Sequence, residues 1–273
     1  MKKINLRKNG GPIIFLGSTN AMPMMYALEL KKLGYDVIYF VDRPKNDLLN
    51  RPECHFSQVS YPYPDWIVEL KVPSQLLVPL HRTIVYLRVI REIKKLCDGN
   101  VQAIFLNSMF ITMSHLFIRK DIPVISLSHG GDLDSWADLE NIDKLKSSFS
   151  SFSFLKYLPK KISYSLIDIV AKRQFKGFCN STYVLYFPKG FNKNGDSVIS
   201  KLERLGVIYV PRFDISFSPL QGADRTFKAN SKKLILFSGV RFTFKSFSEG
   251  NEGYNKGNDE IIIKKIIDKK LNS

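Results

Sequence analysis

Residues 12–41 read PIIFLGSTNAMPMMYALELKKLGYDVIYFV, and this stretch decides the fold. Its apolar residues change from a continuous run to helical spacing and back to a continuous run. The expected elements are a buried strand at Pro12–Leu16, a tight polar loop at Gly17–Asn20, a helix at Met22–Leu33 stopped by Gly34, and a strand at Asp36–Val41. A strand, a helix and a second strand in this order form the unit from which parallel sheets are built.

The same alternation continues along the chain. We expect a helix at Thr83–Leu96, a strand at Ala103–Leu106, a helix at Met109–Arg119, a strand at Pro123–Leu127, a long helical region to about Phe178, and strands at Tyr183–Phe187 and Gly206–Val210. Alternating strands and helices predict a parallel sheet with helices on both faces. The expected fold class is therefore α/β, Rossmann-like.

Domain boundaries follow from a change of composition near Pro211. Residues 1–211 form the expected first domain, and residues 212–231, rich in Pro, Gly, Asp and Ser, predict a linker. Residues 232–273 predict the first strand (Leu234–Ser238) and helix (Asp259–Lys270) of a second Rossmann-like domain. They are too few for a complete α/β domain of about 100 residues, so we expect this domain to be incomplete.

The chain is strongly basic, with 41 Lys and Arg against 25 Asp and Glu and a formal net charge of +16. Such a charge favours phosphate-bearing ligands, polyanions or anionic lipid. Nucleic acid is not an expected partner, because no zinc finger, RNP motif or helix-turn-helix accompanies the charge. The segment from Lys144 to Phe178 interleaves eight basic residues and one Asp with aromatic residues, which indicates an anionic membrane surface as partner or, alternatively, a solvated basic helix.

Targeting signals are weak in this sequence. Met1–Lys8 is basic, but the apolar run that follows ends at Leu16, and no run reaches the roughly 18 to 20 apolar residues of a membrane-spanning helix. Cys54, Cys97 and Cys179 lie far apart without metal-ligand spacing. We expect a cytoplasmic protein, peripheral on the inner face of the membrane, with no metal and no cofactor.

Two loops that follow strands are candidates for ligand binding. Gly17, Ser18 and Asn20 come after the first strand, where open α/β sheets place ligands, although a glycine needed only for the turn is the alternative. The spacing G-x-G-x-x-G of a dinucleotide site is absent. The second loop is Ser128–Asp132, whose members His129, Gly130, Gly131 and Asp132 would meet the first loop at the same edge.

His129 is the candidate catalytic residue of the second loop. An imidazole there would hydrogen-bond a sugar hydroxyl or stabilise charge on a departing donor. The alternative is that Asp132-Leu-Asp134 forms a carboxylate pair for a divalent metal, as in the D-x-D element of GT-A glycosyltransferases. Near the C-terminus, Arg241 and Lys256 flank one expected loop and would bind a diphosphate, unless they are solvated surface charges.

Three local patterns in chain order resemble the retaining family-4 (group 1) GT-B glycosyltransferases of bacterial surface-polysaccharide synthesis. They are Leu30-Lys-Lys-Leu-Gly-Tyr-Asp-Val-Ile-Tyr39, His129-Gly-Gly-Asp132, and Val210-Pro-Arg-Phe-Asp214 followed by Ser238-Gly-Val-Arg241 and Lys256-Gly-Asn-Asp259. The resemblance spans the whole chain. It departs from the family in that the paired glutamates gripping the donor would lie beyond Ser273, and in a longer stretch between Arg241 and Lys256.

This resemblance implies roles for the candidate residues. The N-terminal domain would bind a lipid-linked or polysaccharide acceptor, and the C-terminal domain a nucleotide-sugar donor. Gly17 would line the diphosphate or acceptor side, His129 would face the donor sugar, and Arg241 and Lys256 would hold the diphosphate. Two further hypotheses stay open: a binding module without catalysis, and a sugar epimerase on the same architecture.

Overall fold

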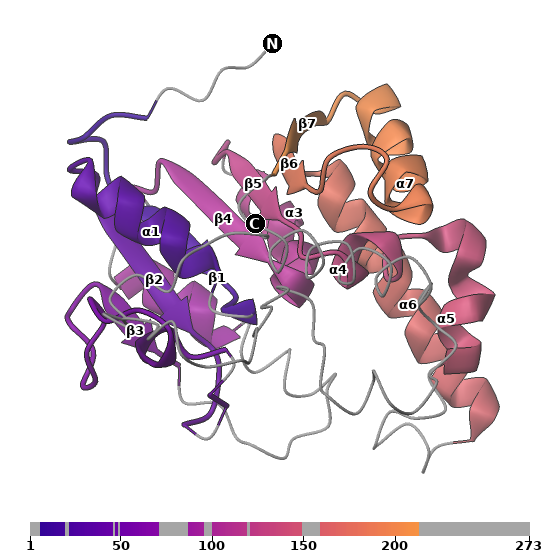
Figure 1. Cartoon of the computed structure of the whole chain (residues 1–273), viewed down its shortest axis with the longest axis horizontal. Coiled ribbons are helices and arrows are strands. Elements are labelled where there is room, and N and C mark those ends of the chain that lie inside the picture. Colours follow the sequence, from indigo (N-terminus) through magenta and orange to yellow (C-terminus); the bar gives the residue numbers. More distant parts are fainter. Residues whose placement is uncertain are drawn as a thin grey trace, which may run out of the picture. The chain divides into compact units, whose positions relative to one another are not determined.

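The structure is a computed structural model and describes residues 6–19, 22–45, 47–48, 50–70, 87–95, 100–118, 121–148 and 159–212 (Figure 1). These residues form one parallel sheet of seven strands in the order β3-β2-β1-β4-β5-β6-β7. The strands are β1 (Ile13–Leu16), β2 (Val37–Val41), β3 (Ile67–Glu69), β4 (Ala103–Asn107), β5 (Val124–Leu127), β6 (Tyr183–Tyr186) and β7 (Ile208–Pro211).

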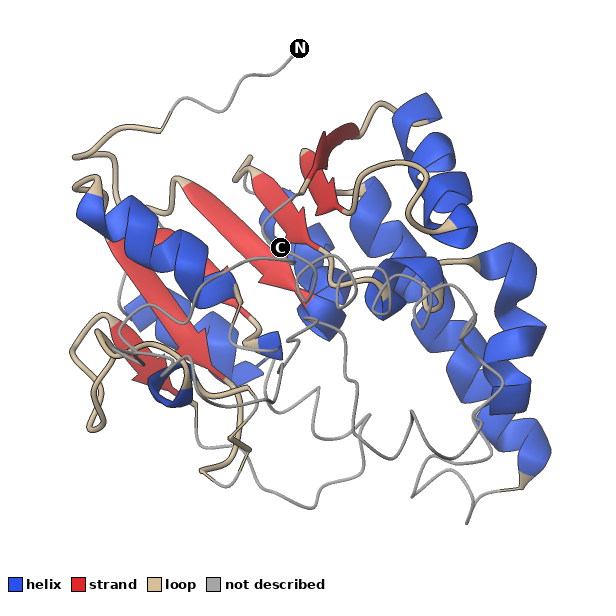
Figure 2. Ribbon diagram, in the orientation of Figure 1, coloured by secondary structure: helices blue, strands red, loops and turns tan. Residues whose placement is uncertain are grey.

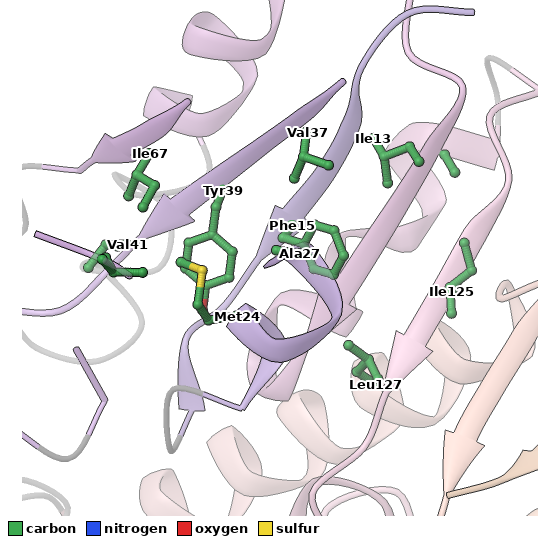
Figure 3. Packing of buried hydrophobic residues seen from close by; sticks show 12 residues of the cluster. Ile13, Phe15, Met24, Ala27, Val37, Tyr39, Val41, Ile67, Ile125 and Leu127 are labelled. Atoms are coloured by element: carbon green, nitrogen blue, oxygen red, sulfur yellow. The ribbon is translucent and has the colours of Figure 1, made fainter. Parts of the chain in front are cut away.

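The core lies between the central strands and the first helix, α1 (Pro23–Lys32). All four residues of β1 are buried, and its neighbours are aligned so that Phe15 lies beside both Tyr39 and Phe105. The rings of Phe15 and Phe105 stack at 4.4 Å. In the same core, Met24 of α1 lies beside Tyr39, and Ala27 of α1 lies beside Phe15 (Figure 3). A strand buried on both faces has to be apolar throughout, which is why β1 shows no alternation.

Helices cover both faces of the sheet (Figure 2). Helix α1 lies in front of β1 and β2 in this view, whereas α3 (Ser114–Ile118) lies behind β4 and β5. The remaining helical elements are η2 (Pro52–Cys54), η3 (Ser108–Met113), residues 87–95, α4 (Gly131–Asp134), η4 (Leu139–Asn141), α5 (Ile142–Ser148), α6 (Lys160–Cys179) and α7 (Lys193–Arg204). The predicted α/β, Rossmann-like class is confirmed.

Most predicted elements are present with shifts of one or two residues. The strands expected at Pro12–Leu16, Ala103–Leu106 and Pro123–Leu127 correspond to β1, β4 and β5. The helix expected at Met22–Leu33 is α1, which begins with Pro23 in its first turn, where proline needs no backbone donor. Strand and helix signals here are local, which explains the agreement.

Two helical predictions were only partly right. The helix expected at Met109–Arg119 begins as the 3₁₀ segment η3 and becomes α-helical only at Ser114, and β-branched Ile111 and Thr112 lie in the tighter part. The long helical region expected to Phe178 is divided into α4, η4, α5 and α6, and α6 starts directly after Pro159. Pro159 is the residue that flanks the first turn of α6, and as a proline it has no backbone N–H that would need a helical partner.

Three elements were not predicted: β3, α7 and the short 3₁₀ segment η2. Strand β3 has three residues at the edge of the sheet, which is too short for a periodicity signal. Helix α7 begins with Lys-Asn-Gly-Asp, in which Asn, Gly and Asp have low helix propensity. The Asn192 side chain caps the helix by accepting hydrogen bonds from the backbone amides of Asn194 and Gly195. Its buried side chains then fix it to the domain.

The C-terminal predictions lie outside the described residues. These are the linker beyond Arg212, the strand at Leu234–Ser238, the helix at Asp259–Lys270, and the site residues Arg241 and Lys256. None of the helices in the described ranges combines the length and apolarity needed to cross a bilayer.

Candidate functional site at the carboxyl edge of the sheet

The strand order reverses its direction of growth between β1 and β4, which are neighbours in the sheet. In open α/β sheets, ligands bind outside the carboxyl ends of the strands at such a switch point. The loops that leave β1, β4 and β5 all start at this edge, because the strands are parallel. The candidate loops at Gly17 and at His129 therefore belong to the same region.

The loop after β1 is held in place by side chains at the ends of the neighbouring strands β2 and β4. Gly17 has φ of +93°, and a Cβ at this position would lie 2.6 Å from the backbone oxygen of Asn107. The fully buried Ser18 donates its hydroxyl to Asp42 at 2.8 Å. Glycine at position 17 is thus required by the turn and by the close approach of β4, and the Ser18 hydroxyl is engaged within the protein. Asn20 lies outside the described residues.

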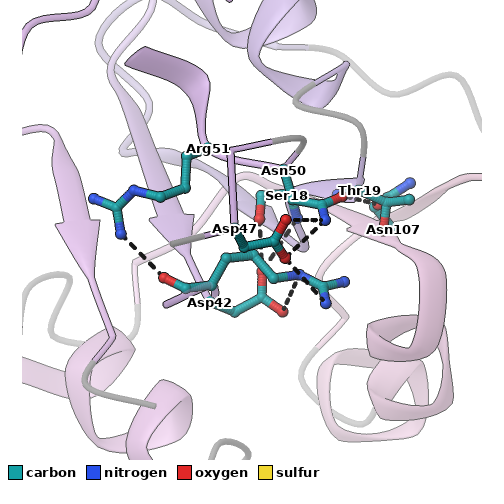
Figure 4. Close-up of polar contacts among 8 residues, drawn as sticks. Ser18, Thr19, Asp42, Asp47, Asn50, Arg51 and Asn107 are labelled. Atoms are coloured by element: carbon teal, nitrogen blue, oxygen red, sulfur yellow. Dashed lines mark hydrogen bonds and ion pairs between the residues drawn. The ribbon is translucent and has the colours of Figure 1, made fainter. Parts of the chain in front are cut away.

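Asp42 directly follows β2 and organises the loop after this strand (Figure 4). Its carboxylate accepts from the Ser18 amide and hydroxyl and lies 3.7 Å from the guanidinium of Arg43. Arg43 also pairs with Asp47 at 4.0 Å, and Asp47 accepts from the Asn50 amide at 2.8 Å. An acid at the end of the second strand binds ribose in dinucleotide-binding sheets, but here protein donors occupy it.

Asn107 connects the two candidate loops. It ends β4, between β1 and β5, and its side-chain oxygen accepts from the Thr19 amide at 3.2 Å. Its side-chain nitrogen donates to the carbonyl of Leu127 at 2.7 Å. Because Asn107 is buried and uses both ends of its amide, the loop after β1 and the loop after β5 share one anchor.

Ser108, directly after this anchor, has a left-handed backbone with φ of 54°. A non-glycine residue in this region is uncommon and is often found at functional sites. The side chain of Gln174 on α6 donates to the Ser108 carbonyl at 3.0 Å and holds the turn in place. The turn therefore presents strained backbone at the switch point.

Asp132 fixes the shape of the loop after β5. Its Oδ1 accepts from the Ser128 hydroxyl at 2.6 Å and from the His129 amide at 3.0 Å. Its Oδ2 is buried and has no hydrogen-bond partner among the described residues. Burial raises the pKa of this carboxyl to about 6, against the opposing effects of Ser128, the His129 amide and Arg212. The carboxyl therefore titrates close to neutrality.

His129 points its Nε2 into buried surroundings, where this atom finds no hydrogen-bond partner among the described residues, although the residue as a whole is partly exposed. Burial, and secondarily the charge of Arg212, lowers the pKa of the ring from 6.5 to about 3. The imidazole is consequently neutral at physiological pH. It can exchange a hydrogen bond with a ligand, but it does not carry positive charge.

The two glycines of this loop have different environments. Gly130 has φ of +112°, and a Cβ there would lie 3.1 Å from the ring of Phe187. A Cβ on Gly131 would meet nothing within 4 Å. The backbone of Gly131 therefore borders open space beside His129, which leaves room for another molecule to approach.

The alternative of a metal-binding carboxylate pair receives no support from the geometry. Asp134 accepts from the Tyr186 hydroxyl at 3.3 Å, the Asn192 amide at 2.8 Å and the Ser135 hydroxyl at 3.0 Å. These contacts tie the loop to β6 and to the start of α7. In the part of the chain that the structure describes, no group of three or more His, Cys, Asp or Glu side chains could hold a metal ion.

Arg212 contributes to this site, although the sequence places it at the start of a linker. It is 3% exposed, and its amide donates to the Tyr186 carbonyl at 2.7 Å. Its guanidinium lies 6.0 Å from the ring centre of Phe187 and acts electrostatically on both His129 and Asp132. Arg212 thus packs as part of the sheet domain.

Comparison with known proteins gives structural similarity without sequence similarity. No protein-family model matches the sequence, and no curated protein matches it. Among solved structures, the Phytolacca americana UGT2 complexed with UDP-2fluoro-glucose and pterostilbene has a TM-score of 0.46 at 9% identity, over 77% of this chain and 55% of that one. A ugt transferase from Siraitia grosvenorii in complex with UDP has a TM-score of 0.47 at 11% identity, over 76% and 48%.

A third structure, a UDP-glucosyltransferase from Polygonum tinctorium capable of glucosylating indoxyl, has a TM-score of 0.45 at 13% identity, over 82% of this chain and 55% of that one. This chain therefore spans about half the length of these proteins. The TM-scores are below 0.5, so the fold assignment stands on the strand order itself.

The structure brings together some of the predicted site residues and adds others. Gly17 and Ser18 lie at the same edge as His129, Gly130, Gly131 and Asp132 and are connected to them through Asn107. Sequence reasoning missed four residues of this edge: Asp42, Asn107, Ser108 and Arg212. Asp42 and Asn107 each directly follow a predicted strand, and a polar residue at that position is the signal that could have found them.

The titration of Asp132 predicts a measurable effect on stability. Because the folded protein binds this proton more tightly than the unfolded chain does, ionisation of Asp132 destabilises the fold as the pH rises from about 4 to about 6. In Asp132→Asn this cost is absent. We expect the free energy of unfolding of the variant, relative to the wild type, to rise by about 2–3 kcal/mol between pH 4 and pH 7.

Urea unfolding at several pH values measures this difference. Asp143→Asn is the control, because the Asp143 side chain is 92% exposed, and its unfolding free energy should follow that of the wild type. If the free energy of unfolding depends on pH in the same way for Asp132→Asn and the wild type, Asp132 is already ionised at low pH.

Proposed function

We propose that this chain is the acceptor-binding part of a glycosyltransferase of GT-B architecture. It would transfer a sugar, with retention of configuration, from a nucleotide-sugar donor to a lipid-linked or polysaccharide acceptor in cell-surface glycan synthesis. The resemblance in the order of the sequence motifs supports this proposal. The arrangement of the sheet edge supports it independently.

The observation that carries the proposal is the convergence of two loops at the switch point. Asn107 holds the loop at Gly17 and the loop at His129 together, and Gly131 leaves open space beside them. A parallel sheet uses this edge for ligands. The neutral imidazole of His129, two residues from the exposed backbone of Gly131, suits a hydroxyl-rich ligand such as a sugar.

His129 is the residue we expect to contact the sugar. A hydroxyl both donates and accepts, so it suits either tautomer of the ring. Because the pKa of the ring is about 3, His129 would position the sugar as a neutral group. Arg241 and Lys256, outside the described residues, remain the proposed ligands of the donor diphosphate.

A transfer assay with the full chain tests the proposal. A panel of labelled nucleotide sugars is incubated with lipid-linked saccharides, and the label in lipid and polymer products is measured. For His129→Ala we expect kcat/KM to fall about 10- to 100-fold, the cost of one lost hydrogen bond and an unsatisfied ligand group. His129→Gln, which restores a donor and an acceptor, should recover most of the activity.

The pH profile separates a neutral imidazole from a charged one. Between pH 5 and pH 8 the wild type and His129→Gln should have the same profile, because His129 does not titrate in that range. A product epimerised on the donor would favour the epimerase hypothesis. Absence of both transfer and acceptor binding would contradict the proposal.

A further inference from the structure

Helix α6 buries one side and exposes the opposite one. Its buried residues are Ser163, Ile167, Ala171, Gln174, Gly177 and Phe178. They recur every three or four residues, and the helix packs so closely on η3 that a Cβ on Gly177 would lie within 2.3 Å of the carbonyl oxygen of Ile111. This side of α6 is therefore packed against the rest of the domain.

The exposed side forms a narrow band, which we call the α6 stripe. Its members are Lys161, Ile162, Ser165, Ile169, Lys172, Arg173 and Lys176. At about 100° per residue these positions fall within an arc of about 120°, and the band from Ile162 to Lys176 is about 21 Å long. Ile162 and Ile169 are each 48% exposed, which is unusual for isoleucine on a soluble helix.

The stripe carries four cations and no carboxylate. The nearest acid on the helix, Asp168, accepts from Lys146 of α5 at 2.8 Å. Across the described ranges, none of the four cations of the stripe forms an ion pair. The positive charge of this side is therefore available to a partner.

The structure also narrows the basic region expected from the sequence. Lys146 is only 15% exposed and forms ion pairs with Asp143 and Asp168, so it belongs to the contact between α5 and α6. Four of the exposed basic residues of this region lie on the α6 stripe, whereas Lys144 and Lys160 are exposed outside this face. Most of the exposed positive charge in the described part of the segment is therefore gathered on a single helix face.

We propose that the α6 stripe docks this protein on the surface of an anionic lipid bilayer. Cations attract the anionic headgroups, and the two isoleucines between them enter the boundary between headgroups and acyl chains. Exposed isoleucines favour lipid over nucleic acid, because a phosphate backbone offers them no apolar surface. This inference is independent of the transferase activity proposed above.

Vesicle co-sedimentation with the full chain tests the stripe. We expect the wild type to bind vesicles containing about one-third phosphatidylglycerol at about 0.1 M salt, and to be released at about 0.5 M salt as the charges are screened. In the triple variant Lys172→Gln, Arg173→Gln and Lys176→Gln, the affinity should fall roughly 100-fold, at about fivefold per charge. Ile162→Ser with Ile169→Ser should lose about tenfold with no change of charge.

A charge-matched control separates the stripe from the net charge of the chain. Lys8, Lys193 and Arg204 are exposed and lie on other elements, so their combined replacement by Gln should lower vesicle affinity less than about threefold. Circular dichroism spectra verify that all variants are folded. An absence of vesicle binding by the wild type, or equal losses in the stripe and control variants, overturns the proposal. So does stripe-dependent binding of duplex RNA that the isoleucine variant leaves unchanged.

Discussion

Gly177→Ala should destabilise the protein by about 2–4 kcal/mol, although alanine is the better helix former by about 1 kcal/mol. The reason is the contact between α6 and η3, where an added Cβ would lie 2.3 Å from the oxygen and 2.8 Å from the carbon of the Ile111 carbonyl. These are backbone atoms, which cannot rotate away as a flexible side chain would. The helix has to move outward, which weakens its packing against η3 and α3.

Thermal and urea unfolding of Gly177→Ala measure this effect, with Gly131→Ala as the matched control. Both glycines are helical, but a Cβ on Gly131 meets nothing within 4 Å. Gly131→Ala should therefore change the free energy of unfolding by less than about 1 kcal/mol. Similar values for the two variants would mean that α6 approaches η3 less closely than described.

Gly17→Ala should cost about 3 kcal/mol and disturb both candidate loops. About 1–2 kcal/mol comes from placing a Cβ in the left-handed backbone region. The remainder comes from the overlap with the Asn107 backbone, whose oxygen would be 2.6 Å away. Because Asn107 also holds Thr19 and Leu127, the shift reaches the His129 loop. The proposed transferase activity should fall more steeply than stability alone would explain.

Gly206→Ala measures the cost of the left-handed backbone without any steric overlap of the added Cβ. Gly206 has φ of +85°, close to that of Gly17, but a Cβ there meets nothing within 4 Å. Chemical unfolding should show a loss of only about 1–2 kcal/mol for this variant, the cost of the left-handed backbone alone. Equal losses at positions 17 and 206 would show that the approach of β4 contributes nothing.

The local signals of the sequence predicted most of the elements. Apolar runs such as Ile13–Leu16 and Val124–Leu127 have the length and composition of buried strands, and α1 is bounded by Pro23 and Gly34. Strand β3 was missed because its burial depends on pairing with β2 rather than on its own pattern. Helix α7 was missed because its cap, Asn192, compensates an unfavourable first turn.

The candidate site was predicted in its position but not in its chemistry. A glycine or histidine after a strand is visible in the sequence, because parallel strands place such loops at one edge. The neutral state of His129 depends on burial and on the charge of Arg212, a distant residue that the sequence assigns to a linker. The raised pKa of Asp132 depends on burial, which outweighs the opposite effect of Arg212. The protonation state of a side chain depends on the residues packed around it, and these are known only from the tertiary structure.

The sequence by itself determined the alternation of strands and helices, the parallel sheet and the glycine loops at its carboxyl edge, since each depends on neighbours within a few residues. Only the tertiary structure decided which polar groups join those loops, which cations of α6 face outward, and why Gly17 and Gly177 need to be glycine. Those features arise from contacts between atoms that are distant in the chain, such as Gly177 with Ile111 and Thr19 with Asn107. Their energies depend on distances of a few ångströms that appear only when the elements pack.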